Sequence, residues 1–409
     1  MRRLAVERWV ARLCALGGLL LAASLSHAGG PVSIPSLDGK LQIPGYWFDV
    51  EGSEPKPAII GLHGCGGGLD SKGNFAERFF RYAGYFNAER IHFLPLDSFT
   101  PRGQKSICET PNKLRTIHEA DRREDVFAAI AWLMKQPSVD PSRIVVMGWS
   151  HGAQTVLSTV DATDPYVQAQ KVQPRAAVAF YPGCLVNNKM WNYEVHQPLL
   201  IMIGELDDWT LAHECVTLQQ RLRKNKANAT VELEVYPGSY HGFDGTGPVK
   251  QMVGLGNTKS GTAMVGGNPA AREASHARMF EFLSAQLGQP LLLSHAQRFK
   301  GHHYVVPPAS GFAAADDMAA VPLSEAGKAR YAHFRSLPSP KAFAVTEKGG
   351  WYFNAGEPEA MATTFQQCAR ANSKCWLYAV DDQVVWQADV AARVGAAGLR
   401  RLGGAAAGQ

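Results

Sequence analysis

The feature that most constrains this chain is a regular alternation of strand-like and helix-like segments from about Val32 to Phe243. The strand-like segments are short and mostly apolar: LQIPGYWFDV, PAIIGLH, IHFLPL, RIVVMG, AAVAFYPG, PLLIMIG and VELEVYPG. The helix-like segments between them are FAERFFRYAGYFNAE, EDVFAAIAWLMKQ, HGAQTVLSTV and LAHECVTLQQRLRK. Apolar strands separated by helices predict an α/β fold with a doubly wound, mostly parallel sheet. Functional residues of such sheets gather at the carboxyl ends of the strands.

The first 28 residues have the pattern of an export signal. A basic start is followed by an apolar run from Leu13 to Leu25, which is too short to span a bilayer comfortably. Ser26 and Ala28 place small residues at the −3 and −1 positions of a cleavage site. We therefore predict a signal peptide over residues 1–28 and a periplasmic or secreted mature protein. The alternative is an uncleaved N-terminal anchor.

Composition and charge exclude several classes of partner. Hydrophobic residues make up 46% of the chain and charged residues 19%, so the chain can bury a large core. Removal of residues 1–28 takes away four arginines and one glutamate, which leaves the charges nearly balanced. This balance argues against binding to nucleic acid or to a membrane surface. After signal cleavage, no stretch is apolar enough to predict a transmembrane segment.

The cysteines fit an oxidising compartment. Six of them follow residue 28, an even number that suits disulfide pairing. Strand placement brings them together in pairs, because several follow strands that end at the same edge of the predicted sheet. The pairs favoured in this way are Cys65–Cys108, Cys184–Cys215 and Cys368–Cys375.

The stretch GWSHG, residues 148–152, is the only Gly-x-Ser-x-Gly pattern in the chain. An apolar strand precedes it and a helical pattern follows, so the strand and helix backbones must approach closely at the turn. Glycine on both sides avoids a clash there. Ser150 would then stand at a strained turn above the sheet and at a helix N-terminus, which favours developing negative charge. The pattern predicts a nucleophilic serine.

A serine hydroxyl needs a base to take its proton. His241 follows the strand-like segment VELEVYPG directly and comes after Ser150 in the chain, as this sheet topology requires. The acid that orients the imidazole should lie between them, after the preceding strand. There the segment GELDDW offers Asp207 and Asp208, with Glu205 close by. The residues themselves leave the choice among these carboxylates open.

The glycine-rich segment LHGCGGG, residues 62–68, ends another strand beside the predicted serine. Backbone N–H groups of this loop and the N–H of His151 would together hold an oxyanion. A phosphate-binding loop is the alternative, but the Gly-Lys-Ser/Thr that it needs is absent. The Cys65 side chain is expected in a disulfide rather than as a nucleophile.

Three residues are candidates for the substrate pocket: Trp149, Gly66 and Arg102. Trp149 and His151 flank the serine, and each either lines the acyl pocket or simply packs. Arg102 either meets an acidic substrate or is an ordinary surface arginine. The adjacent pair His302 and His303 is not spaced to share a helix face, and no Cys-x-x-Cys occurs. We expect both histidines to be solvent-exposed, and we predict neither a metal nor a cofactor.

The remaining segments define the domain organisation. Residues 29–288 form the predicted catalytic domain, within which the Gly/Thr/Asn-rich stretch from Thr246 to Pro269 is either a mobile flap or an ordered surface loop. A Pro/Ala/Gly-rich linker is predicted over residues 289–321, a small α+β accessory domain over 322–390 with a turn at Asp381 and Asp382, and an Ala/Gly-rich flexible tail over 391–409.

Four motifs together resemble the dienelactone hydrolase family of α/β-hydrolases: EDVFAAIAWLMKQPSVDPSRIVVMGWSHGA, YPGC, GELDDWT and YHGFD. The resemblance covers about Pro57 to Leu287 and implies an eight-stranded sheet and a hydrolase acting on an ester or lactone. It implies the roles of nucleophile, base and acid for Ser150, His241 and Asp207, because Asp-x-x-Thr-Leu stands where the family often has Asp-x-x-Val-Pro. Cys65 and His151 match the two oxyanion N–H donors.

The chain departs from the family at the nucleophile. The founding lactone hydrolases carry cysteine at the elbow, whereas this chain carries Ser150. This difference favours a more general esterase over a strict dienelactone hydrolase. The C-terminal segment CWLYAVDDQVVW resembles a small accessory module of bacterial exported proteins, to which no activity is assigned.

Three functions fit these observations. The first is a secreted serine hydrolase acting on a small-molecule carboxylic ester or lactone. The second is a serine peptidase of the prolyl-oligopeptidase type, although no propeller precedes the catalytic region. The third is an exported binding protein with an idle hydrolase site, whose C-terminal unit recognises an envelope component. The partner of the C-terminal unit is unknown, and a disulfide-stapled stabilising cap is its other interpretation.

Overall fold

The computed structural model describes most of the chain between residues 29 and 386. The described ranges are 29–50, 52–224, 231–290, 301–302, 306, 309–346, 348–358, 360–370 and 375–386. The predicted signal peptide (1–28) and flexible tail (391–409) lie outside the described residues. Among the described residues, no helix has both the length and the apolar character needed to cross a bilayer.

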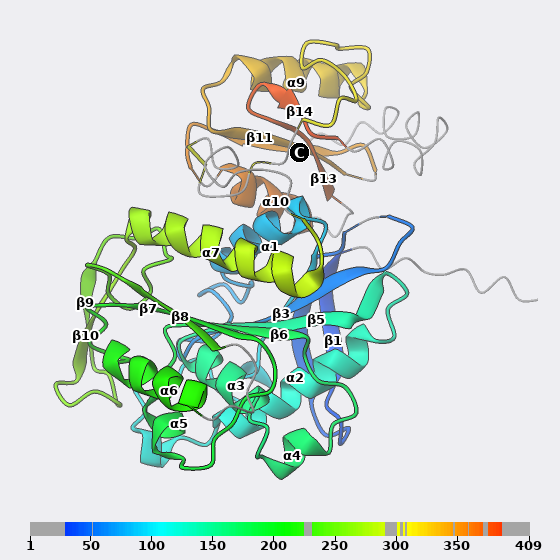
Figure 1. The fold of residues 1–409 in the computed structure, drawn as a ribbon. Helices are drawn as coiled ribbons and strands as arrows, with labels where there is room; N and C mark the ends of the chain where they lie inside the picture. Colours follow the sequence, from blue (N-terminus) through cyan, green and yellow to red (C-terminus); the bar gives the residue numbers. More distant parts are fainter. Residues whose placement is uncertain are drawn as a thin grey trace, which may run out of the picture.

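An eight-stranded sheet forms the centre of the larger unit (Figure 1). Its strand order is β1-β2-β4-β3-β5-β6-β7-β8, and the strands from β4 onward in that order are parallel, whereas β2 is antiparallel to both β1 and β4. The bounds are β1 (Gly30–Pro35), β2 (Gln42–Trp47), β3 (Lys56–Leu62), β4 (His92–Leu96), β5 (Val139–Trp149), β6 (Ala176–Phe180), β7 (Leu199–Gly204) and β8 (Val231–Tyr236). The predicted fold class is confirmed.

Helices cover both faces of this sheet, as the apolar strands require. In Figure 1, α1 and α7 lie on one face, and α2, α3 and α6 lie on the other. The bounds are α1 (Glu77–Ala88), α2 (Glu119–Leu133), α3 (His151–Thr159), α4 (Pro165–Gln168), α5 (Leu185–Lys189), α6 (Ala212–Lys224) and α7 (Pro269–Leu287). Every residue of β3, β4, β6 and β7 is buried between these layers.

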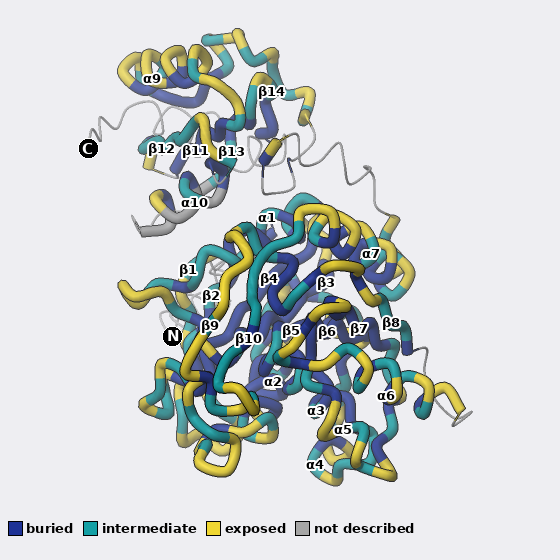
Figure 2. Tube along the Cα trace, turned by 90° about the vertical axis from the view of Figure 1, so that its left-hand side faces the viewer, coloured by how far each residue is buried: buried dark blue, intermediate teal, exposed yellow. Residues whose placement is uncertain are grey.

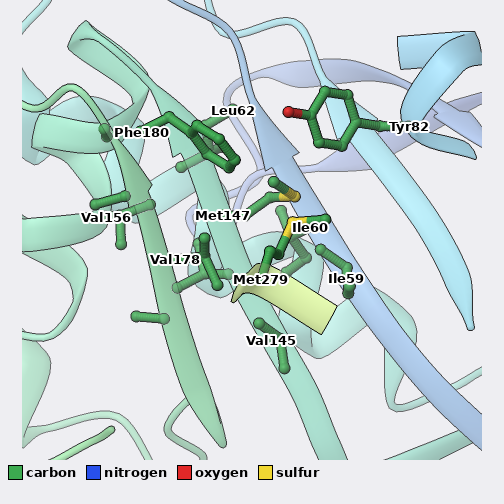
Figure 3. Packing of buried hydrophobic residues seen from close by; sticks show 14 of the residues in the cluster. Ile59, Ile60, Leu62, Tyr82, Val145, Met147, Val156, Val178, Phe180 and Met279 are labelled. Carbon is green, nitrogen blue, oxygen red and sulfur yellow. The ribbon is translucent and has the colours of Figure 1, made fainter. Parts of the chain in front are cut away.

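The core fixes the strand ends at which the site lies. Figure 3 shows Met279 of α7 among Ile60, Met147 and Val178 of three adjacent strands. All four side chains are at most 1% exposed. Burial of one such side chain stabilises the fold by about 1.5 to 3 kcal/mol. The apolar packing along these strands therefore holds the register of the sheet, and with it the positions of the loops at its carboxyl edge.

The sequence of the stretch from Thr246 to Pro269 allows either a mobile flap or an ordered surface loop. It contains an ordered β-hairpin. Its strands are β9 (Lys250–Val253) and β10 (Thr262–Val265). Gly256 donates its N–H to the carbonyl of Cys108 at 2.9 Å, and Met264 donates its N–H to Asp208 Oδ1 at 2.9 Å. The hairpin is thus tied both to the loop that follows β4 and to the loop that follows β7.

A second, smaller unit follows with its own antiparallel sheet, ordered β12-β11-β13-β14. The bounds are α9 (Glu325–Ser336), β11 (Lys341–Thr346), β12 (Trp351–Ala355), α10 (Ala360–Arg370), β13 (Cys375–Val380) and β14 (Gln383–Val384). Figures 1 and 2 show α10 between this sheet and α1 of the larger unit, and α10 contacts α1, β11 and β12. The predicted turn at Asp381 and Asp382 joins β13 to β14.

The smaller unit has a separate aromatic core, built around Tyr331, Phe334, Phe343, Tyr378 and Trp386. Three residues of the predicted linker, Phe312, Ala315 and Met318, pack against this core, and Val321 is buried in it. The segment from 309 to 321 therefore contributes to the packing of the C-terminal unit and does not simply connect the two units.

The expectation that His302 is solvent-exposed is wrong. Its side chain is buried, and Nε2 lies 3.0 Å from both carboxylate oxygens of Asp381. The imidazole satisfies a carboxylate at the β13–β14 turn, which explains its burial. His303 lies outside the described residues.

Candidate active site

The backbone at Ser150 has the strained geometry that the Gly-x-Ser-x-Gly pattern predicts. Ser150 has φ 55° and ψ −118° between the end of β5 and the start of α3. A Cβ on Gly148 would lie 2.4 Å from the carbonyl carbon of Gly152, and a Cβ on Gly152 would lie 2.1 Å from the carbonyl oxygen of Leu62. No other residue fits at either position, so the two glycines permit the close crossing of strand and helix.

The glycine-rich loop after β3 lies directly beside the serine. A Cβ on Gly64 would lie 3.4 Å from Ser150 Cβ and 4.0 Å from Ser150 Oγ. Neither the Cys65 N–H nor the His151 N–H donates a turn or loop hydrogen bond to another described residue. His151 is the first residue of α3, where the helix itself leaves N–H groups unpaired. The loop and the helix start therefore offer backbone donors around a serine that is itself partly exposed.

One of the three candidate carboxylates contacts the imidazole. Asp207 Oδ2 lies 2.8 Å from His241 Nδ1, and both side chains are buried. Asp207 also accepts hydrogen bonds from the N–H of Trp209 and from the N–H and hydroxyl of Thr210, at 2.7 to 3.0 Å. These donors hold the carboxylate in a fixed orientation. Nδ1 of His241 faces the acid, so Nε2 is the nitrogen left to act as a base.

The neighbouring carboxylates have other contacts. Asp208 Oδ1 accepts the N–H of Met264 in the hairpin, and Glu205 Oε2 accepts the N–H of Gly238 at 2.9 Å. Both are structural contacts of loops at the sheet edge. The structure thus brings Asp207 to the imidazole and engages Asp208 and Glu205 elsewhere.

Ser150 and His241 each contact a residue at the carboxyl end of β6. Ser150 donates its N–H to the carbonyl of Phe180 at 2.9 Å, and the ring of the next residue, Tyr181, lies 4.6 Å from the His241 ring. The Ser150 hydroxyl makes no hydrogen bond to any residue that the structure describes. Hydrogen bonds between nucleophile and base are often long or misaligned before substrate binds. The three side chains share one sheet edge, with the acid–base contact already formed.

A buried carboxylate that sequence reasoning missed lies under this site. Asp244 is fully buried and accepts hydrogen bonds from Tyr181 Oη at 2.6 Å, Tyr82 Oη at 2.8 Å and Trp149 Nε1 at 3.1 Å. Arg78 Nη2 lies 3.6 Å from its Oδ1. Burial opposes ionisation of Asp244, but the Arg78 charge and the tyrosine hydroxyls outweigh it and lower the pKa of this carboxyl. The only sequence signal was the aspartate that ends HGFD.

A buried arginine was also missed. Arg122 of α2 is fully buried, with Nη1 2.7 Å from His151 Nδ1 and Nη2 2.7 Å from the carbonyl oxygen of His63. Burial lowers the pKa of Arg122 to about 10, so the guanidinium remains charged at neutral pH. Nothing in the sequence distinguishes Arg122 from its neighbour Arg123.

The residues considered for the substrate pocket lie in different environments. The Trp149 ring is buried and packs against Phe79, Tyr82 and Phe180, so it belongs to the core. The His151 side chain is likewise buried, and it contacts Arg122. Gly66 is exposed, and a Cβ there would meet nothing within 4 Å.

Arg102 does not supply a free charge for an acidic substrate. Its guanidinium makes two hydrogen bonds of 2.9 Å to the two carboxylate oxygens of Asp125 and one of 2.8 Å to the carbonyl of Ser98. This bidentate contact engages the face with which an arginine binds carboxylates. The interpretation of Arg102 as a substrate-binding residue is therefore replaced by a structural one.

Two disulfides join the loops at the carboxyl edge. The structure contains Cys65–Cys108 and Cys184–Cys215, two of the pairs that strand placement favours. Cys368 is disulfide-bonded as well, and the side chain of its expected partner Cys375 lies outside the described residues. Within the described part of the chain, no group of three His, Cys, Asp or Glu residues is placed to hold a metal ion.

Several solved structures are similar to this chain at low identity and with TM-scores below 0.5. Esterase 2 from Thermogutta terrifontis, phosphoramylated by tabun, is 16% identical with a TM-score of 0.47, covering 67% of this chain and 100% of that one. Its propionate-bound form is 15% identical with a TM-score of 0.46 and the same coverage. A Klebsiella pneumoniae subsp. pneumoniae protein provisionally named dienelactone hydrolase is 20% identical with a TM-score of 0.45, covering 63% and 98%.

Family membership rests on a direct match to a sequence model. The model of the Dienelactone hydrolase family matches residues 45–287, which is more than half of the chain and begins somewhat before the stretch whose motifs carry the resemblance. The match includes the elbow, the acid loop and the histidine loop, and it ends at the last residue of α7. This chain therefore belongs to the dienelactone hydrolase family.

Proposed function

We propose that this protein is an exported serine hydrolase that cleaves carboxylic esters or lactones through an acyl-enzyme on Ser150. The observation that carries the proposal is the buried contact between His241 Nδ1 and Asp207 Oδ2, at the sheet edge where Ser150 has its strained backbone. Three further hydrogen bonds fix the Asp207 carboxylate, as expected of an acid that orients a catalytic imidazole.

The proposed reaction uses these groups in sequence. Ser150 Oγ attacks the acyl carbon while His241 Nε2 takes the hydroxyl proton, and Asp207 stabilises the imidazolium that forms. The carbonyl oxygen becomes an oxyanion that accepts hydrogen bonds from the N–H groups of Cys65 and His151. Collapse of this intermediate expels the alcohol, which takes the proton from His241. Water then attacks the acyl-enzyme in the same way and releases the acid.

Probe labelling tests this assignment. A fluorophosphonate should label wild-type protein on Ser150, and Ser150→Ala should abolish labelling and lower kcat for an ester by at least about 10⁴-fold. A panel of esters, lactones and peptide amides then separates an esterase from a peptidase. Wild-type protein that is folded but not labelled would favour an idle site and contradict the proposal.

Export is part of the proposal and has separate support. The first 28 residues have the pattern of a secretory signal, and the cross-links Cys65–Cys108 and Cys184–Cys215 suit an oxidising compartment. N-terminal sequencing of protein recovered from the periplasm or medium should begin just after Ala28. Recovery of the uncleaved chain in the cytoplasm, with free thiols, would contradict export.

A further inference from the structure

Arg122 links the two backbone segments on which the proposed oxyanion hole depends. One of its nitrogens contacts the His151 side chain at 2.7 Å, and the other donates to the carbonyl of His63 at 2.7 Å. His151 carries one of the two oxyanion donors, and His63 stands two residues before Cys65, which carries the other. One planar guanidinium thus spans from the end of β3 to the start of α3.

The neighbouring contacts fix which nitrogens carry protons. His63 Nε2 accepts the N–H of Ser98 at 3.2 Å, so Nδ1 is the donor to the Gly64 carbonyl at 2.7 Å. His151 Nδ1 accepts from Arg122, so its Nε2–H faces Glu119 Oε1 at 3.4 Å. Both imidazoles are neutral in this arrangement, and each has a defined orientation.

Ordinary ion pairing does not account for Arg122. No carboxylate of the described residues forms a direct ion pair with its guanidinium, although the side chain is fully buried. The charges of Asp125, Glu119 and Asp97 favour the charged form only from a greater distance. The guanidinium also lies over the Phe99 ring, 5.1 Å from its centroid. A buried charge without such a partner is costly. The next residue, Arg123, also lies over an aromatic ring, but it has in addition a direct ion pair, since its Nη1 lies 2.7 Å from Asp164. The unusual placement of Arg122 points to a role in the site.

We propose that Arg122 is a positioning residue that holds the Cys65 and His151 N–H groups at the spacing an oxyanion requires. This inference rests on the proposed serine hydrolase function. Arg122 touches no substrate; it acts through the His63 carbonyl on one side and the His151 ring on the other. Other contacts anchor the far side of the loop, because Ile107 donates its N–H to the Cys65 carbonyl at 2.9 Å. The Arg122 guanidinium holds the loop on the side that faces α3, through its hydrogen bond to the His63 carbonyl.

A positioning role predicts a selective kinetic effect. Loss of one oxyanion donor in serine hydrolases costs about 10² to 10³ in kcat, and a misplaced donor should cost somewhat less. Arg122→Met should therefore lower kcat by roughly 10- to 100-fold with KM within about twofold of wild type, because only the transition state uses the oxyanion contacts. Arg122→Lys keeps the charge but not the planar fork and should lose about 10-fold.

The experiment compares full-length wild-type protein with Arg122→Met, Arg122→Lys and the matched control Arg123→Met. The measurements are kcat and KM for a short-chain p-nitrophenyl ester, the rate of fluorophosphonate inactivation, the affinity for an alkylboronic acid that forms a tetrahedral adduct, and Tm. Both Arg122 variants should lose inactivation rate and boronate affinity in parallel with kcat. Arg123→Met should lower Tm while kcat stays within about threefold of wild type.

The outcomes separate this inference from the function on which it rests. If wild type is not labelled on Ser150, the proposed function fails. If wild type is labelled but folded Arg122→Met or Arg122→Lys reacts at the wild-type rate, only the positioning role fails. Should the Met variant not fold, the Lys variant decides the matter, since an unchanged kcat in that protein would overturn the proposal. An equal loss of kcat in Arg123→Met would also overturn it, because the effect would then follow stability alone.

Discussion

His241 Nδ1 and Asp207 Oδ2 lie 2.8 Å apart in a buried contact, while the adjacent Asp208 turns away to accept a hydrogen bond from the hairpin at Met264. Two consecutive aspartates in the same loop therefore have different environments. Asp207 accepts hydrogen bonds from several donors beside an imidazole, and Asp208 anchors a surface element. This difference makes the assignment of the acid testable.

Substitution of the two aspartates should give unequal losses of activity. Asp207→Asn should lower kcat by about 10⁴-fold, because the amide disfavours the histidine tautomer needed for catalysis and cannot stabilise the imidazolium. Asp208→Asn should change kcat by less than about threefold, since its oxygen still accepts the hairpin N–H. Steady-state kinetics on one ester checks both values. Equal losses in the two variants would remove Asp207 from its proposed role.

The elbow glycines should be intolerant of any side chain. Gly152→Ala places a Cβ 2.1 Å from the Leu62 carbonyl oxygen, so backbone atoms must move. We expect a loss of about 2 kcal/mol or more in the free energy of unfolding. Gly66→Ala is the matched control, because its Cβ would meet nothing within 4 Å. Urea denaturation of both variants measures the difference, and similar stabilities would argue against the close crossing of β5 and α3.

These glycines also show why part of the site could be predicted from sequence. The elbow depends on a strand, a turn and a helix that follow one another directly, and chain order then places His241 and the acid loop after later strands. Such features are local or follow from topology. The choice of Asp207 over Asp208 needed the family motif, because two neighbouring carboxylates look alike until their hydrogen-bond partners are known.

The missed residues depend on contacts between distant segments. Asp244 meets Tyr82 of α1, which is 162 positions away in sequence, and Arg122 meets the carbonyl of His63, 59 positions away. His302 was expected in solvent because its segment is rich in proline and alanine, yet its partner Asp381 lies 79 positions further along. A local sequence pattern does not predict contacts between side chains that are so far apart in the chain.

The two described disulfides should differ in their effect on activity. Cys65–Cys108 fixes the loop that carries a proposed oxyanion donor, whereas Cys184–Cys215 joins the segment before α5 to α6. Each closes a loop of similar length, so replacement of either pair by alanine should cost about 4 kcal/mol of stability.

Only the Cys65/Cys108 double alanine variant should also lose kcat, by about 10-fold or more, because its loop can no longer hold the oxyanion donor in place. Kinetics at a temperature where both variants are folded, judged by circular dichroism, separates the two effects. If the Cys184/Cys215 variant lost the same amount of kcat, the loss could not be attributed to the position of the loop at Cys65.

Stability should fall as the pH drops below neutrality. Burial, reinforced by the Arg122 charge, holds the pKa of both His63 and His151 well below the usual range. Below about pH 6.5 these imidazoles bind protons in the unfolded chain but not in the folded one. The free energy of unfolding is therefore fully retained above about pH 6.5 and decreases below it, by up to about 1.4 kcal/mol per pH unit for each histidine.

Urea denaturation between pH 7.5 and 5.5 measures this slope. His63→Gln should reduce the slope of stability against pH, because only His151 then contributes to it. His213→Gln, at an exposed position, is the control that should leave the slope unchanged. A wild-type stability that is flat across this range would contradict the buried neutral state of the two imidazoles.

Asp244 should combine a structural role with an effect on catalysis. Its carboxylate accepts three hydrogen bonds and pairs with Arg78. An asparagine there offers one oxygen and turns an N–H₂ group toward other donors, so Asp244→Asn should cost about 3 to 5 kcal/mol in the free energy of unfolding. Tyr82→Phe removes a single donor and should cost only about 2 kcal/mol.

The two tyrosines that donate hydrogen bonds to Asp244 should differ in their effect on kcat, because only one of them contacts His241. The Tyr181 ring contacts the His241 ring, and its hydroxyl is fixed by Asp244 Oδ1, so Tyr181→Phe should loosen this contact and lower kcat on the order of 10-fold. Tyr82→Phe should leave kcat nearly unchanged, because the Tyr82 hydroxyl binds the other carboxylate oxygen, Oδ2. The two variants each remove one hydroxyl from the same acceptor and are matched in chemistry. Equal kcat values in the two folded variants would mean that Asp244 supports the core without positioning the base.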